Sequence, residues 1–156
     1  MRGVRRIVAA LACGATLAFA EPYESDPGLA KRDDDYAAGL AHVEKKDFTA
    51  AVKAFEKACV RHPDHADLLN MLAFSYRKLG QFEPAFRHYK DALKIDPRHR
   101  GAHEYIGEAY LQVGDLANAR KHLEALKQIC LLPCDELGDL QKAIDAHVAK
   151  APKPAT

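Results

Sequence analysis

Apolar positions in this chain recur with helical spacing, and the whole pattern returns every 34 residues from about residue 35 to about residue 130. Within each aligned series the size of the side chain is largely kept. The series include Ala51, Ala85 and Ala119; Phe48, Phe82 and Leu116; Phe55, Tyr89 and Leu123; and Ala38, Leu72 and Ile106. Because so many positions share one period, the pattern predicts an array of helical repeats.

Each repeat is expected to hold two helices. In the second repeat, Gly80 suits the left-handed turn that ends a first helix. A second helix is expected over about 82–95, where Asp96-Pro97 stops it. No segment alternates with period two, so the predicted fold is all-α. The expected architecture is a helix-turn-helix solenoid with repeats at about 35–65, 66–99 and 100–131.

A further helix is predicted after the third repeat. Pro133 followed by two acidic residues is a helix-start signal. The segment 134–148 then carries one apolar stripe with a polar opposite face, which suits a helix that covers the open end of the stack. Residues 149–156, rich in Ala, Lys and Pro, are expected to form a disordered tail.

These residues resemble the tetratricopeptide repeat (TPR) family over roughly residues 33–131. The second repeat carries the resemblance best, through Leu72, Ala73, Tyr76, Gly80, Ala85, Tyr89, Ala92 and Pro97. The other repeats match more loosely, since His42 replaces a tyrosine, Lys46 a turn glycine and Leu131 a proline, and the chain has no tryptophan. The resemblance implies a stack of helical hairpins that offers a surface to a protein partner.

The first twenty residues read as a secretory signal peptide. Three arginines precede an uncharged apolar stretch at 7–17, and Ala18-Phe19-Ala20 is a cleavage box, so cleavage after Ala20 is expected. A lipoprotein or twin-arginine signal is matched less well. Residues 21–34, with two prolines and several acids, are expected to form a flexible leader that ends at the acidic run 33–35 as the N-terminal turn of the first helix. The mature chain is therefore expected to be periplasmic or secreted.

Loss of residues 1–20 changes the charge balance. That segment holds three arginines and no acids, so the formal net charge moves from +1 to −2. A mildly acidic chain lacks the clustered basic face that nucleic acid requires. No nucleic-acid partner is expected, and no span across a membrane is expected in the mature chain.

The resemblance implies that the first helix of each repeat lines a concave groove. The candidate partner-binding residues on that face are Tyr36, Leu40, Glu44, Asn70, Phe74, Arg77, Lys78, Glu104, Tyr105, Glu108 and Leu111. Tyr36, Phe74 and Tyr105 are the expected apolar anchors. The alternative is that some of these side chains only pack between helices.

The charges in this face bear on the kind of ligand. Some TPR grooves grip a C-terminal carboxylate with Lys, Arg and Asn, but the corresponding places here include Tyr36, Leu40, Met71 and Tyr105. A carboxylate clamp is therefore not expected. Glu104 and Glu108, one helical turn apart, would instead favour a ligand with Lys or Arg, unless Arg77 and Lys78 neutralise them.

Three cysteines remain after signal cleavage. Cys130 and Cys134 flank a proline-broken junction, and in an oxidising compartment such a pair is expected to form a structural disulfide. Reduced packing cysteines, or a soft-metal site that adds one of the eight histidines, are the alternatives. Most of the histidines are expected to be solvated. Cys59 is expected to be a small buried thiol.

The sequence predicts a binding scaffold rather than an enzyme. It contains no nucleophile with its base, no glycine-rich phosphate loop and no zinc-protease motif, and no cofactor is expected. The predicted function is a protein–protein interaction scaffold in the cell envelope that binds a partner segment in the groove. The alternative is a metal-handling or redox-responsive module centred on Cys130 and Cys134. Self-association through the end of the array is a third possibility.

Overall fold

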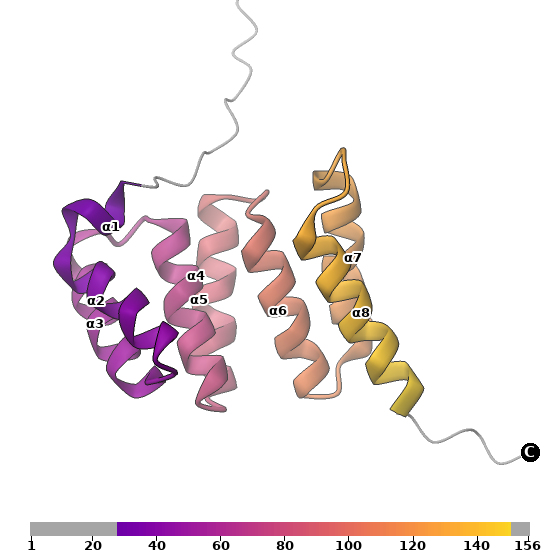
Figure 1. Ribbon diagram of the computed structural model, residues 1–156. Coiled ribbons are helices and arrows are strands. Elements are labelled where there is room, and N and C mark those ends of the chain that lie inside the picture. The colour runs from indigo at the N-terminus through magenta and orange to yellow at the C-terminus, as the bar shows by residue number, and fades with distance from the viewer. Residues whose placement is uncertain (1–27, 151–156) are drawn as a thin grey trace, which may run out of the picture.

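The computed structural model describes residues 28–150, and within this range it contains helices and no strand (Figure 1). Three antiparallel helix pairs, α2 with α3, α4 with α5 and α6 with α7, stack side by side, and α8 packs on α6 and α7. The predicted all-α solenoid of three repeats with a C-terminal capping helix is confirmed. The helices are α1 Leu29–Arg32, α2 Asp34–Glu44, α3 Phe48–Arg61, α4 Ala66–Lys78, α5 Phe82–Ile95, α6 Arg100–Gln112, α7 Leu116–Ile129 and α8 Asp135–Lys150.

Side chains at the helix starts satisfy backbone amides that have no partner inside the helix. Asp47 and Asp115 accept the N–H of Ala50 and Asn118, the third residue along in each case. His65 and His99 do the same through Nδ1 at the starts of α4 and α6. The two histidines lie one period apart, so the repeat has duplicated its turn chemistry together with its core.

The turn between the two helices of each repeat needs a backbone with positive φ. Gly80 and Gly114 supply it at 73° and 82°. Glycine is favoured there because it has no Cβ to clash. In the first repeat the same register holds Lys46, which adopts φ 58°. The first repeat therefore keeps the turn geometry of its neighbours although it lacks their glycine.

The core follows the size of the repeated side chains. Ala51, Ala85 and Ala119 are completely buried where the two helices of each repeat cross. One helical turn after each of these alanines, a larger side chain fills the interior of the repeat. In the first repeat this residue is Phe55, which is completely buried. A Cβ built on Gly39 would lie 2.3 Å from the Phe55 ring, so glycine is required for this approach of α2 to α3.

The chain begins its ordered packing earlier than predicted. Residues 28–34 were assigned to a flexible leader, but α1 lies within this segment and its Leu29 is 1% exposed in the core of the first repeat. Asp33 is also buried and caps α2 by accepting the N–H of Tyr36 at 2.8 Å. Arg61 donates two hydrogen bonds to the Asp33 carboxylate, at 2.8 and 2.9 Å. The structure therefore differs from the expected flexible leader at residues 28–32, where apolar burial orders the chain, while the acidic residues from Asp33 begin the helix as expected.

Asp33 is expected to make the first repeat sensitive to acid. The hydrogen bonds from Arg61 hold the pKa of Asp33 at about 2, below its ordinary value of 3.8. This contribution to stability is complete above pH 3.8 and is lost as the pH falls towards 2. After allowance for the solvent around Arg61, about 1–2 kcal/mol is expected to disappear over that interval.

Urea denaturation of the wild type and Asp33→Asn at several pH values checks this expectation. Asp33→Asn should be less stable at neutral pH and should lack this loss at low pH. Asp47→Asn, which changes an exposed N-cap, is the matched control and should keep the acid dependence of the wild type. Equal acid dependence in wild type and Asp33→Asn would contradict the assignment.

The C-terminal helix is longer than expected. It runs to Lys150, so residues 149 and 150, assigned to the tail, are helical. Leu140 and Ile144 of α8 are buried against α6 and α7. Residues 1–27 and 151–156, which hold the expected signal peptide, the first half of the leader and the rest of the tail, lie outside the described residues. No described helix is long and apolar enough to cross a membrane.

Candidate functional site: the concave groove

The first helices of the repeats and α8 line one face of the array, and this face is hollowed at two places. A first hollow of about 510 Å³ lies between α2, the start of α3 and α4. A second, of about 390 Å³, lies between α4, α6 and α8. The first is lined by Val43, Glu44, Lys46, Phe48, Phe74 and Lys78, and the second by Arg77, Lys78, Glu108, Leu111, Gln112, Ala143, Ala146, His147 and Lys150. Together they form the groove.

A row of aromatic rings crosses the groove from the first repeat to the third. The ring of Phe74 meets Phe48 edge-on at 6.0 Å between centroids, and Tyr105 at 5.0 Å. All three side chains are half-buried. The ammonium of Lys78 lies 5.3 Å from the centroid of Phe74. Half-buried aromatic surface of this kind suits contact with the apolar side chains of a ligand.

A buried arginine supports the row from below. Arg77 is only 4% exposed, and its guanidinium carbon lies 5.3 Å from the ring centroid of Phe74 and 5.5 Å from that of Tyr105. One guanidinium nitrogen pairs with Glu108 of α6 at 2.6 Å. The pair joins α4 to α6 and fixes the two rings between them. Arg77 is therefore part of the groove wall rather than a free charge for a ligand.

Glu104 of α6, one turn before Glu108, is a half-buried acidic residue that lacks a cation. No ion pair among residues 28–150 includes it, since Arg77 pairs with Glu108 instead. Burial, together with the nearby carboxylates of Glu108, Asp139 and Glu136, raises the pKa of Glu104 to about 7. A cation of a ligand placed beside Glu104 would therefore stabilise the ionised form of its carboxyl group.

The structure divides the predicted groove residues into three groups. Glu44, Phe74, Lys78 and Glu108 line the groove, and the ring of Tyr105 contacts that of Phe74. Leu40 and Glu104 are half-buried but line neither hollow, and Leu40 packs on the core of the first repeat. Four others are buried: Tyr36, Asn70, Arg77 and Leu111.

Tyr36 is not available as an apolar anchor. It is 8% exposed and packs against Phe55, with ring centroids 5.7 Å apart, in the core of the first repeat. Leu111 belongs to the core of the third repeat. Asn70 is 5% exposed at the α4–α6 contact, and its side-chain oxygen has no hydrogen-bond partner. The expectation of an anchor at Tyr36 is corrected because α1 closes over this end of the array.

Other groove residues were missed from the sequence. Phe48 was named only as one member of a repeated series, and its ring lines the groove. Glu136 and Asp139 of α8 face Glu104, while Ala143 and His147 line the second hollow. The predicted capping helix could have indicated these residues. A helix that stacks where the first helix of a fourth repeat would lie extends the groove.

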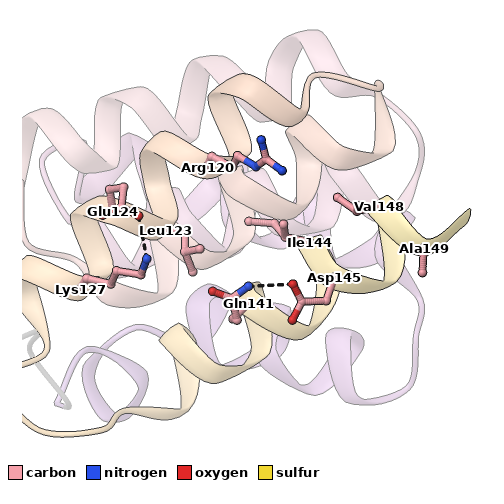
Figure 2. Close-up of a pocket in the computed structure, with 9 residues that line it drawn as sticks. All are labelled: Arg120, Leu123, Glu124, Lys127, Gln141, Ile144, Asp145, Val148 and Ala149. Carbon is pink, nitrogen blue, oxygen red and sulfur yellow. Dashed lines mark hydrogen bonds and ion pairs between the residues drawn. The ribbon is translucent and has the colours of Figure 1, made fainter. Parts of the chain in front are cut away.

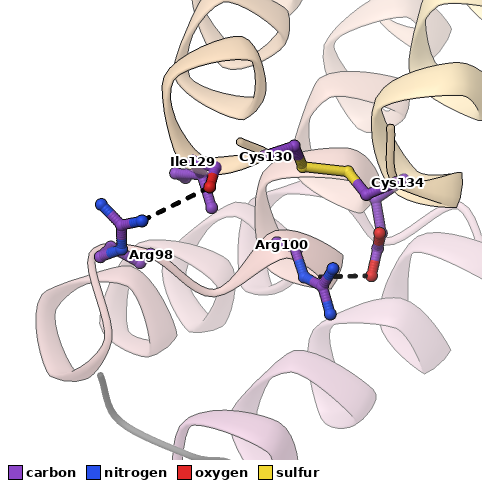
Figure 3. Close-up of a disulfide and its surroundings, with 6 residues drawn as sticks. Arg98, Arg100, Ile129, Cys130 and Cys134 are labelled. Carbon is purple, nitrogen blue, oxygen red and sulfur yellow. Dashed lines mark hydrogen bonds and ion pairs between the residues drawn. A yellow bond between two sulfur atoms is a disulfide. The ribbon is translucent and has the colours of Figure 1, made fainter. Parts of the chain in front are cut away.

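The cysteines lie away from the groove. The sulfurs of Cys130 and Cys134 are joined across the α7–α8 loop, with Cα atoms 6.0 Å apart (Figure 3). Cys59 is a free, half-buried thiol, and burial raises its pKa to about 11. Among the described residues, no three His, Cys, Asp or Glu side chains are grouped so as to hold a metal ion.

Fewer histidines are solvated than expected, since burial lowers the pKa of four of the eight: His65, His88, His103 and His122. His103 and His122 face each other through Nδ1 at 2.9 Å inside the third repeat, and His103 Nε2 meets the carbonyl oxygen of Pro97. Burial lowers the pKa of both, that of His122 to about 4. The pair is a neutral hydrogen-bonded link between α6 and α7.

Comparison with known proteins finds repeat proteins of the same kind. The family model described as "Anaphase-promoting complex, cyclosome, subunit 3" matches residues 33–126. The small glutamine-rich tetratricopeptide repeat-containing protein 2 of Mycosarcoma maydis is 32% identical over 90 residues, which cover 58% of this chain and 26% of that protein. The chain thus spans about a quarter of the length of this relative.

Solved structures share the fold. The TPR2B domain of yeast Sti1, in complex with pHsp70, superposes with a TM-score of 0.69 at 22% identity over 78% of this chain and 98% of that one. The type III secretion chaperone SycD of Yersinia enterocolitica, in complex with a peptide of the translocator YopD, gives 0.65 at 18% identity over 76% and 90%. Two similar folds are therefore known with partners bound.

Proposed function

This chain belongs to the tetratricopeptide repeat family, and from that premise we propose that it is an interaction scaffold that binds a segment of a partner protein in the groove. Two solved structures of the same fold are complexes, one with pHsp70 and one with a peptide of YopD. In this chain the groove offers half-buried aromatic rings and charged groups along four helices. These are the features that recognise an extended or helical peptide.

The observation that indicates which chemical groups the ligand carries is the environment of Glu104. It is a half-buried carboxyl group without a cation, beside the ring of Tyr105 and among three further acids. The partner segment we propose carries a lysine or arginine for this carboxylate and apolar side chains for Phe48, Phe74 and Tyr105. Basic and apolar groups on one segment would satisfy both parts of the groove.

Selection of a random peptide display library on the purified chain tests the proposal. The wild type should enrich peptides that combine Lys or Arg with aliphatic or aromatic residues. Phe74→Ala should weaken binding of the enriched peptides by about tenfold or more, since a central aromatic contact is lost. Glu104→Gln should shift the selection away from basic peptides, while Glu124→Gln on the exposed side of α7 is the matched control. Equal enrichment on Glu104→Gln would contradict the role of Glu104.

The same peptides should bind with a characteristic pH dependence. The Glu104 carboxyl must lose its proton to pair with a cation, and its pKa of about 7 lies above the ordinary 4.5. Affinity should therefore rise as the pH increases through 7, by about three- to tenfold. The affinity of Glu104→Gln should stay flat over this range. Titration calorimetry at several pH values measures both.

We also propose that the chain acts in the cell envelope after export, on the strength of the charge, apolar stretch and cleavage box in residues 1–20. Intact mass of the exported chain, with and without reductant, tests cleavage and the oxidation of Cys130 and Cys134 together. No contact described above favours the metal-handling alternative, because the sulfurs of Cys130 and Cys134 are bonded to each other.

A further inference from the structure

The charges of the array are divided between its two sides. The second helices of the repeats, α3, α5 and α7, carry nine Lys or Arg residues and four Asp or Glu residues. The helices on the groove side, α2, α4, α6 and α8, carry five Lys or Arg residues and ten Asp or Glu residues. The two sets of helices form opposite sides of the array (Figure 1). The groove side is therefore net negative, and the side formed by the second helices is net positive.

One cation on the positive side returns with the period of the repeat. Lys53, Arg87 and Lys121 are 34 residues apart, so they stand at the same register of the three second helices. All three side chains are exposed. No described carboxylate forms an ion pair with any of them. We call this row of three cations, which runs from the first repeat to the third, the cationic ladder.

Acidic side chains of the same helices offset this charge only in part. Asp91 and Glu124 are each paired with a further lysine of their own helix, at 2.6 and 2.7 Å. Glu56 accepts a hydrogen bond from Tyr76, and Glu83 is exposed. These last two are the acids of α3, α5 and α7 that have no ion pair with a described residue. Six cations of the same helices have none either: Lys53, Lys57, Arg87, Lys90, Arg120 and Lys121.

Two of the six cations come together at the junction between the second and third repeats. Lys90 of α5 and Lys121 of α7 both act on His122, whose pKa is lowered mainly by burial and also by these two charges. No carboxylate counteracts them at this histidine. Farther away, Asp47 and Asp115 stand at the starts of α3 and α7, where each carboxylate accepts an N–H of its own helix. The junction thus keeps a positive charge that no described acid pairs with.

We propose that the cationic ladder docks an acidic partner protein, whose Asp or Glu side chains reach Lys53, Arg87 and Lys121 on the side opposite the groove. This second surface goes beyond the groove and does not depend on what the groove binds. Because the two sides carry opposite net charge, an acidic partner is directed to the ladder and a basic segment to the groove. The chain can then hold two partners at the same time and act as a bridge between them.

A protein fits the ladder better than a bilayer or a nucleic acid does. Stable docking on a bilayer takes apolar burial in addition to charge. On α3, α5 and α7, Val60 is the one large apolar side chain that is strongly exposed. A DNA duplex carries about one charge per 1.7 Å of its axis, so its phosphates would also meet the exposed Glu56 and Glu83. A protein can place acids at the ladder and other groups at these two carboxylates.

Fluorescence anisotropy of a labelled helical peptide with glutamate at every third or fourth position, titrated with the full chain, tests the ladder. We expect saturable binding at about 50 mM salt that weakens at about 200 mM. Arg87→Gln with Lys121→Gln should weaken binding by about tenfold, because two contacts with carboxylates are lost. Lys94→Gln with Lys127→Gln is the matched control. It removes the same charge from the same two helices, but from lysines that are already paired, and should weaken binding by less than about twofold.

The same variants give the outcomes that contradict the proposal. Absence of saturable binding, or an equal loss in the matched control, would overturn it. A DNA duplex or phosphatidylglycerol vesicles that bind more tightly than the acidic peptide, and lose this binding in Arg87→Gln with Lys121→Gln, would overturn the choice of a protein. Self-association of the chain in sedimentation velocity that the ladder variant abolishes would assign the ladder to a second copy, and would overturn the proposal as well.

Discussion

Replacing Phe55 with alanine is expected to lower the free energy of unfolding by about 3–5 kcal/mol. The ring is completely buried in the first repeat, against Gly39 of α2 and Tyr36. Truncation removes the transfer free energy of the ring and leaves a cavity. The surrounding backbone cannot close this cavity freely, because α1 and α4 also pack on the same core. Urea denaturation followed by circular dichroism measures the loss.

Val60→Ala in the same helix is the matched control. Its side chain is 83% exposed, so a change within about 0.5 kcal/mol is expected. In a stack of repeats each unit contacts only its neighbours, so the loss from Phe55→Ala should be local. Hydrogen exchange should accelerate most in α2 and α3 and least in α7 and α8. A loss below about 1 kcal/mol would mean that Phe55 is not the central packing residue of the first repeat.

The second large effect is expected from Glu108→Ala, which should cost about 3 kcal/mol. The reason is the charge that remains: Arg77 is 4% exposed, and its pairing carboxylate is gone. The two rings beside Arg77 cannot replace a carboxylate as hydrogen-bond acceptors. Urea denaturation again provides the measurement, with Glu124→Ala as the control for loss of an exposed pair with Lys127.

Arg77→Met tests the explanation, because it removes the buried charge together with the need for a partner. An apolar side chain of similar length is expected to cost less than Glu108→Ala. Glu108→Ala should then add little further loss in the Arg77→Met background. If both single variants cost the same and their losses add, Arg77 and Glu108 do not act as a pair.

The sequence predicted the repeats well because the constraint is local and periodic. Ala51, Ala85 and Ala119 mark the close helix crossings, and they are all completely buried. Gly80 and Gly114 mark the turns by a backbone requirement that glycine satisfies best. Each of these predictions needs only one residue type and one spacing.

The groove was predicted less completely because it depends on what covers each helix. Tyr36 occupies a register that faces the groove, yet α1 and His65 leave it in the core. Leu29 was not read as a core residue because four helical residues leave no periodic signal. Arg77 was expected among the ligand contacts, with neutralisation of Glu104 and Glu108 as the alternative, and the structure pairs it with Glu108 of the neighbouring helix. These contacts are made between elements, and the period does not encode them.

The place of α8 determines how this array could grow. Leu72, Ile106 and Leu140 are each 34 residues apart and almost completely buried, so α8 stands where the first helix of a fourth repeat would stack. The second helix of such a repeat would pack in the hollow between α7 and α8, which Figure 2 shows rimmed by charged side chains. Four of the residues that line it are Arg120, Glu124, Lys127 and Asp145. A further hairpin added after α8 would have to desolvate these charges, whereas a repeat inserted between α5 and α6 would meet surfaces already shaped for stacking. An engineered extra repeat should thus be accommodated more easily between α5 and α6 than directly after α8.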